Sequence, residues 1–207
     1  MQQQVSIGLD LKPQTNSGPV ALAFYISPQT RSPQNELAQR YSGLRIHGGQ
    51  QQFIDAMRAI EPSIERVEVL ASATVPQLYL TIAGSPPLPI SVLGEGMNSV
   101  ANYVTAILEA ADGTVLIDEI ENGIHYSALE SLWRQIGRSV RETNSQVVAS
   151  THSAECVAAA YRALRDTPNI LRVLRLKPGT QSPAAETVAN YDIEALEGAI
   201  EQNLEVR

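Results

Sequence analysis

Two adjacent acids at the end of a short apolar run are the residues of this sequence best suited to chemistry. Asp118 and Glu119 directly follow Val115 to Ile117. An acid at the carboxyl end of a buried parallel strand points into the crevice where open α/β sheets bind ligands. Asp118 could hold Mg²⁺ through water, and Glu119 could orient or deprotonate an attacking water. Taken alone, such a pair is more often a capped strand end, so its meaning depends on other motifs.

A second motif, formed by Gly94, Glu95 and Gly96, lies at the start of a predicted helix. Glycines at this position let backbone N–H groups approach an anion, and the N-terminus of a helix favours negative charge. The alternative is a strand-to-helix turn that needs a positive φ. The sequence leaves both interpretations open.

The third motif is His152, which follows a predicted strand and stands among the hydroxyl residues Ser150, Thr151 and Ser153. Its imidazole could hydrogen-bond a γ-phosphate or an attacking water. A lone histidine after a strand is more often a capping or partly buried residue. Because His152 follows the strand that comes after the acid pair, the functional interpretation is favoured here.

Four other side chains that could do chemistry are not assigned to the candidate site. Glu121 and His125 follow the acid pair and could indicate a metal cluster or a dimer contact, but they lack a recognisable zinc-ligand arrangement. Cys156 falls on the apolar face of a predicted helix and is expected in the core. His47 lies in a Gly-rich loop and is expected to be solvated.

From Pro89 onward, strands alternate with helices, which predicts right-handed crossovers and a largely parallel sheet. Apolar stripes at helical spacing predict a helix after each of the three motifs, with a closing helix near the C-terminus. The expected strands are Ile90 to Leu93, Val115 to Ile117, Gln146 to Ser150 and Ile170 to Leu176.

The region before Pro89 is predicted to be rich in strands. Val5 to Leu11 alternates as a half-buried strand and is expected to form a hairpin or meander with Val20 to Ile26. Residues 27–49 look mostly like loop with one helical turn, and Phe53 to Ile60 predicts a short amphipathic helix that ends before Pro62. Two more strands are expected at 64–70 and 78–82. We therefore divide the chain into a β-rich segment, 1–88, and an α/β lobe, 89–207.

Composition narrows the class of protein. With 207 residues, 43% of them hydrophobic, the chain is large enough for one sizeable core. A formal net charge of −7 and only two lysines argue against a broad nucleic-acid-binding face. The single cysteine fits a reducing compartment, and the sequence lacks a long apolar run or signal peptide, so a cytoplasmic location is expected.

The three motifs in this order resemble those of ABC-type ATPases, especially the RecF-like and OLD-like proteins of the AAA family. Gly94 to Met97 resembles the signature loop, Val115 to Glu119 the Walker B motif with its glutamate, Ile120 to Ile124 the D-loop, and His152 the switch histidine. The resemblance implies the C-terminal lobe of a P-loop NTPase, with a mainly parallel sheet flanked by helices and a β-rich N-terminal segment. It also implies ATP or GTP as substrate, Mg²⁺ bound by Asp118, and sites shared between two subunits.

The sequence departs from this family in two respects. Gly94 and Met97 replace the usual Ser and Gln or Glu of the signature loop, and no Gly-x-x-x-x-Gly-Lys-Ser/Thr motif is found. Without that phosphate loop and its lysine, most of the hold on the β- and γ-phosphates is missing. Hydrolysis would need a Walker A motif from elsewhere, in a homodimer or a partner chain. The alternative is a non-catalytic lobe that dimerises with or regulates an intact ATPase. Nothing in the sequence supplies a nuclease site, and nucleic-acid binding is expected only by family analogy.

Overall fold

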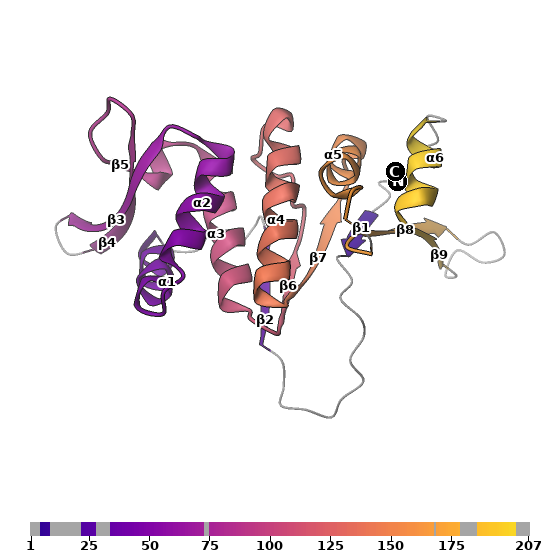
Figure 1. Cartoon of the computed structure of the whole chain (residues 1–207), viewed down its shortest axis with the longest axis horizontal. Coiled ribbons are helices and arrows are strands. Elements are labelled where there is room, and N and C mark those ends of the chain that lie inside the picture. Colours follow the sequence, from indigo (N-terminus) through magenta and orange to yellow (C-terminus); the bar gives the residue numbers. More distant parts are fainter. Residues whose placement is uncertain are drawn as a thin grey trace.

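The computed structural model describes residues 5–8, 22–27, 34–72, 75–167, 169–178 and 186–201. These residues form two sheets and the helices that cover them (Figure 1). The acid pair and His152 directly follow strands of the larger sheet, and the smaller sheet lies at one end of the molecule (Figure 1). The predicted α/β architecture with a mainly parallel region and flanking helices is confirmed.

The larger sheet has the strand order β2-β6-β7-β1-β8-β9. Strands β2, β6 and β7 run parallel, whereas β1 is antiparallel to both of its neighbours and β9 is antiparallel to β8. The carboxyl ends of β6 and β7 therefore lie side by side. The strands span Ala23–Ile26 (β2), Thr114–Ile117 (β6), Gln146–Thr151 (β7), Val5–Gly8 (β1), Arg172–Pro178 (β8) and Glu186–Tyr191 (β9).

The predicted pairing of the first two strands is wrong. Strand β1 lies between β7 and β8, with Ser6 level with both Ser150 and Leu174, and β2 pairs with β6. The alternation of residues 5–11 indicated a strand but contained no information about its partner, because strand neighbours are set by contacts distant in sequence. Residues 9–11, 20 and 21 of the two predicted strands lie outside the described residues.

The segment expected to be loop contains a helix, α1 (Gln34–Ile46). Its buried residues Leu37, Tyr41 and Leu44 recur at helical spacing and pack into the core. The Tyr41 hydroxyl donates to the Val67 carbonyl at 3.2 Å, and its ring meets Phe53 edge-on at 4.9 Å. Helix α2 (Gln50–Ile60) is found where it was predicted. These helices pack beside the smaller sheet, formed by β3 (Ile64–Ser72), β4 (Val75–Ile82) and β5 (Leu88–Pro89).

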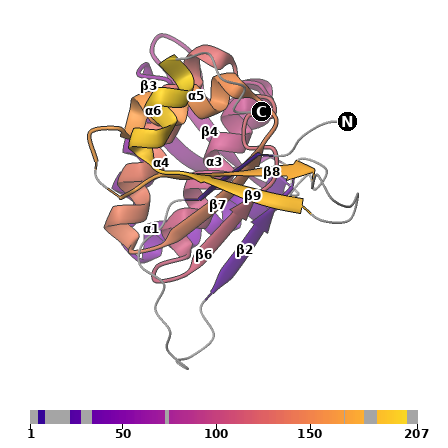
Figure 2. The ribbon, with the colours of Figure 1, turned by 90° about the vertical axis from the view of Figure 1, so that its right-hand side faces the viewer.

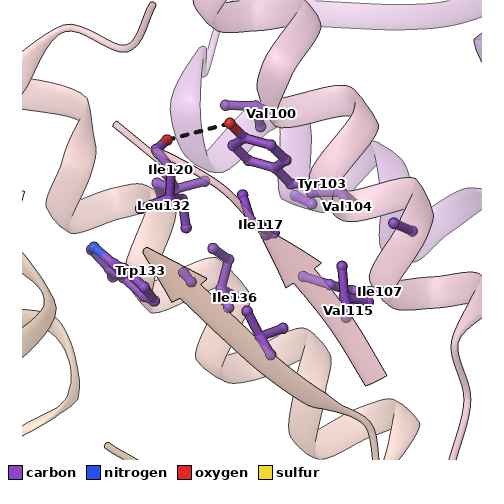
Figure 3. Packing of buried hydrophobic residues seen from close by; sticks show 14 of the residues in the cluster. Val100, Tyr103, Val104, Ile107, Val115, Ile117, Ile120, Leu132, Trp133 and Ile136 are labelled. Atoms are coloured by element: carbon purple, nitrogen blue, oxygen red, sulfur yellow. Dashed lines mark hydrogen bonds between the residues drawn. The ribbon is translucent and has the colours of Figure 1, made fainter. Parts of the chain in front are cut away.

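Three amphipathic helices, predicted from their apolar stripes, follow the three motifs. They are α3 (Glu95–Glu109), α4 (Leu129–Thr143) and α5 (Ala154–Leu164), and α4 and α5 lie on one side of the larger sheet (Figure 2). Figure 3 shows Trp133 and Ile136 of α4 and Ile107 of α3 gathered with Val115 and Ile117 of β6. On the face of the larger sheet that packs against these helices, Val115 is 0% exposed. On the opposite face Tyr25 and Leu116 are 66% and 40% exposed.

The remaining elements complete the chain around this core. Helix α6 (Ile193–Glu201) closes the described chain and buries Leu196. Two short 3₁₀ helices, η1 (Ile90–Val92) and η2 (Tyr126–Ala128), precede α3 and α4. The strand predicted at Ile90 to Leu93 is therefore wrong, because the chain turns into η1 directly after the short strand β5. Within the described residues, no helix is both long and apolar enough to span a lipid bilayer.

The single cysteine is buried, as predicted. The Trp133 indole N–H donates to the Cys156 sulfur at 3.4 Å. Burial raises the pKa of the Cys156 thiol from 9.0 to about 11, and the charge of Glu121 adds to the increase. The thiol is therefore protonated in the folded protein at neutral pH and should be unreactive.

We predict that Cys156 reports global unfolding. Labelling with a disulfide reagent at neutral pH should be slow in the native protein and rapid in denaturant, because the thiolate is the reactive form. The raised pKa stabilises the fold fully below pH 9 and loses this contribution as the pH rises through about 11. Between pH 9 and about pH 11 the unfolding free energy of Cys156→Ala should accordingly fall less steeply than that of the parent protein. Rapid labelling of the native protein would contradict the burial of this thiol.

Candidate functional site

The hydroxyl of Ser150 connects the acid pair to the neighbouring strand. Ser150 Oγ donates to the Asp118 carboxylate and accepts the Glu119 N–H at 2.9 Å. The Ile120 N–H donates to the Ser150 carbonyl at 3.1 Å, and the Asp118 N–H donates to the Ile26 carbonyl at 2.9 Å. The acid pair is thus held between β2 and β7, at the carboxyl ends of parallel strands.

Glu119 has a backbone conformation that is unusual for its side chain. Its φ of 49° lies in the left-handed region, which costs roughly 1–2 kcal/mol for a residue with a Cβ. The hydrogen bond to Ser150 and the complete burial of Ile120 hold the turn in this shape. Strained residues of this kind concentrate at functional sites, because the surrounding structure must enforce them.

His152 is joined to the acid-pair loop through its main chain. The His152 N–H donates to Glu121 Oε1 at 3.0 Å, directly after the end of β7. Beyond it, Ser153 caps α5 by accepting the Cys156 N–H at 3.1 Å, and the Ser153 N–H donates to Thr151 Oγ1 at 3.1 Å. Hydrogen bonds therefore hold the main chain at His152 and directly after it.

Glu121 was not recognised from sequence as part of this arrangement. The sequence indicates a D-loop position, a metal ligand or a dimer contact for Glu121, because nothing in a linear spacing shows that the loop turns back onto β7. The one available signal was a third acid close behind the acid pair. The Tyr103 hydroxyl donates to the Ile120 carbonyl of the same loop at 3.4 Å (Figure 3). Burial raises the pKa of Tyr103 to about 12, and the Glu121 charge contributes to this shift.

The glycine motif packs against the acid-pair loop by backbone contact. Gly94 has a φ of 102°, so the turn interpretation holds for that residue. At Gly96 a Cβ would lie 2.5 Å from the Gly123 carbonyl oxygen, and a Cβ at Gly123 would lie 3.2 Å from Glu95 Cγ. All three sequence motifs therefore meet around one loop, residues 118–124.

The donor set fits magnesium held together with a phosphate ligand, but not a protein cage. Asp118 supplies a carboxylate beside the Ser150 hydroxyl, and both are hard oxygen donors. Among the described residues, no group of three or more His, Cys, Asp or Glu side chains is placed to hold a metal ion. Magnesium commonly takes one or two carboxylates plus substrate phosphates and waters.

The two remaining histidines lie outside this cluster. His125 caps η2, since its Nδ1 lies 2.9 Å from Ser127 Oγ and accepts the Ser127 N–H at 3.4 Å. Its ring stacks obliquely on exposed Tyr126 with centroids 4.3 Å apart. His47 is exposed in the turn between α1 and α2, as expected from the sequence.

Comparison with known proteins identifies the family. Residues 11–158 match the family described as AAA domain, putative AbiEii toxin, Type IV TA system. The chain belongs to this family. The match includes all three motifs of the candidate site. The chain is also 28% identical over 104 residues to an ATP/GTP phosphatase of Helicobacter pylori, a region that is 48% of this chain and 28% of that relative. It therefore spans little more than a quarter of that protein.

Solved structures of SMC ATPases share the fold. One, from work on ATP-driven dimerization and DNA-stimulated activation of SMC ATPases, gives a TM-score of 0.54 at 12% identity, covering 81% of this chain and 99% of the other. An SMC head bound to the C-terminal winged-helix domain of ScpA gives 0.51 at 13% identity, covering 81% of this chain and 50% of the other. The α/β fold is thus that of P-loop ATPase heads, and the family supports an ATPase-related function.

We predict that Gly96→Ala destabilises the protein by about 1–3 kcal/mol, the usual effect of forcing an extra carbon into a closed contact. The clash is with the backbone oxygen of Gly123, which cannot swing away as a side chain would. Gly43→Ala is the matched control, because Gly43 lies inside α1 with no atom within 4 Å of the new Cβ. The Gly43→Ala substitution should stabilise the protein by about 0.5–1 kcal/mol. Chemical denaturation of both variants measures the difference, and equal effects would disprove the close contact.

Proposed function

We propose that this chain is the C-terminal lobe of an ABC-type ATPase that hydrolyses the γ-phosphoanhydride of ATP or GTP in a Mg²⁺-dependent reaction. The supporting observation is the convergence of Asp118, Glu119 and the His152 segment at the carboxyl ends of the adjacent strands β6 and β7. Open α/β sheets bind their ligands at this edge. The family match and the shared fold agree with this assignment.

In this proposal each side chain has a defined task. Asp118 holds Mg²⁺, which when bound neutralises charge on the phosphate oxygens. Glu119 orients the attacking water and accepts its proton, while Ser150 keeps the Glu119 main chain in place. His152 hydrogen-bonds the γ-phosphate and so makes the site sensitive to its presence.

The phosphate loop is proposed to come from a different stretch of polypeptide. Gly94, Glu95 and Gly96, at the N-terminus of α3, would face the nucleotide of a second subunit, where backbone N–H groups and the helix dipole favour phosphate. The functional unit would then be a homodimer or a complex with a Walker A-bearing chain. In this arrangement residues 89–207 form the catalytic lobe, and residues 1–88 form the β-rich N-terminal segment of the same ATPase domain, whose strands β1 and β2 complete the larger sheet.

A non-catalytic role is the second candidate. The absence of a Gly-x-x-x-x-Gly-Lys-Ser/Thr motif from the sequence favours it, because the lysine and the backbone cradle normally provide the main contacts to the β- and γ-phosphates. In that case the lobe would dimerise with, or regulate, an intact ATPase. The two candidates differ in whether Glu119 takes part in chemistry.

We predict that Glu119→Gln lowers turnover by about 10²–10⁴-fold, the usual contribution of a positioned acid or base. Phosphate release would be measured on the chain reconstituted with the Walker A-bearing polypeptide of the same source. Glu155→Gln is the control, because it removes the same charge from an exposed residue in the first turn of α5. Turnover that is equal in Glu119→Gln and the control would favour the regulatory role instead.

A further inference from the structure

Glu121 occupies an unusual place for an acid. Its Oε1 accepts the His152 N–H at 3.0 Å, while its Oε2 is buried and has no hydrogen-bond partner within the described part of the chain. Buried polar atoms without partners are rare in folded proteins, because they lose their hydration without compensation. Joining two loops would require only one acceptor oxygen. A carboxylate gives that one acceptor a full negative charge, which strengthens its hydrogen bond to the His152 N–H.

Several hydrogen bonds and the burial of Ile120 hold the loop that carries Glu121. Turn hydrogen bonds join Asn122 N–H to the Glu119 carbonyl at 2.8 Å and Ile124 N–H to the Glu121 carbonyl at 3.0 Å. Ile120, adjacent in sequence, is completely buried, and its carbonyl accepts the Tyr103 hydroxyl. Glu121 is consequently a fixed point from which a neighbouring segment can be held.

His152 is the segment that Glu121 holds. It is the first residue after β7, so its N–H has left the sheet ladder and would otherwise need water or another acceptor. A hydrogen bond from an amide to a carboxylate is charge-assisted and stronger than one to a neutral acceptor. Together with the bonds of Ser153, Glu121 therefore restrains the His152 main chain, and with it the origin of the imidazole.

We propose that Glu121 is a positioning residue that places His152 relative to Asp118 and Glu119. The carboxylate connects the end of β7 to the loop that leaves β6, so the two halves of the candidate site keep a fixed spacing. The inference deepens the proposed function, because His152 is the residue proposed to sense the γ-phosphate. Glu121 itself need not touch nucleotide.

The test is an NMR comparison of Glu121→Ala, Glu121→Gln and the parent chain without nucleotide. His152 shares the imidazole region with only His47 and His125, so its ring signals can be assigned and the other two serve as internal references. Loss of a charge-assisted hydrogen bond should accelerate exchange of the His152 amide roughly tenfold or more in Glu121→Ala. Its imidazole signals should shift, while those of His47 do not. Glu121→Gln should lie between the two, because an amide oxygen still accepts.

Glu155→Ala is the matched control. It removes the same charge three residues from His152, at an exposed position, and should leave the His152 amide protected. A His152 amide and imidazole that respond equally in Glu121→Ala and Glu155→Ala would overturn the proposal. Should Glu121→Ala not fold, Glu121→Gln decides: signals of His152 identical to those of the parent would also overturn it. No nucleotide enters this experiment, so its outcome is independent of whether the proposed ATPase activity exists.

Discussion

The hydroxyl of Ser150 is the contact on which the candidate site depends. The hydroxyl donates to the Asp118 carboxylate and accepts the Glu119 N–H. The main-chain carbonyl of Ser150 accepts the Ile120 N–H. Parallel pairing of β6 and β7 places the two strand ends side by side, but it does not orient the loops that leave them. Ser150 supplies that orientation and allows Glu119 to keep its left-handed backbone. Ordered loops on a rigid sheet are what a reaction with developing charge requires.

The parts of this molecule that could be predicted from sequence are those governed by local periodicity. The stripes of α3, α4 and α5 and the acid pair at a strand end were found because their residues recur at the spacing of a helix or follow an apolar run. The sequence does not predict helix α1, since the glycines and prolines of this segment obscure the apolar stripe of Tyr41 and Leu44 that the core buries. The place of β1 between β7 and β8, and the contact from Glu121 to His152, arise from residues far apart in the chain. No single-sequence pattern encodes such pairs.

The described contacts also explain how the candidate site keeps its shape. The acid-pair loop is held by Ser150 of β7, by the Tyr103 hydroxyl of α3 and by the close approach of Gly96 to Gly123. None of these contacts involves a phosphate loop. The catalytic half would be built before the nucleotide and the second half arrive, and a proposed partner would complete it by adding phosphate contacts. Within the described part of the chain, the face around Tyr25 and Leu116 is exposed and the helices lie on the other side of the sheet (Figure 2), which is uncommon for parallel strands.

The most direct test of this account is paramagnetic NMR with Mn²⁺-ATP at millimolar concentration. Mn²⁺ uses the same hard oxygen ligands as Mg²⁺ and broadens nearby amide signals. The account predicts selective broadening of residues 118–121 and 150–153, with Asp118→Ala removing most of it. Broadening that is unchanged in Asp118→Ala, or centred elsewhere on the chain, would contradict a nucleotide-metal site at the ends of β6 and β7.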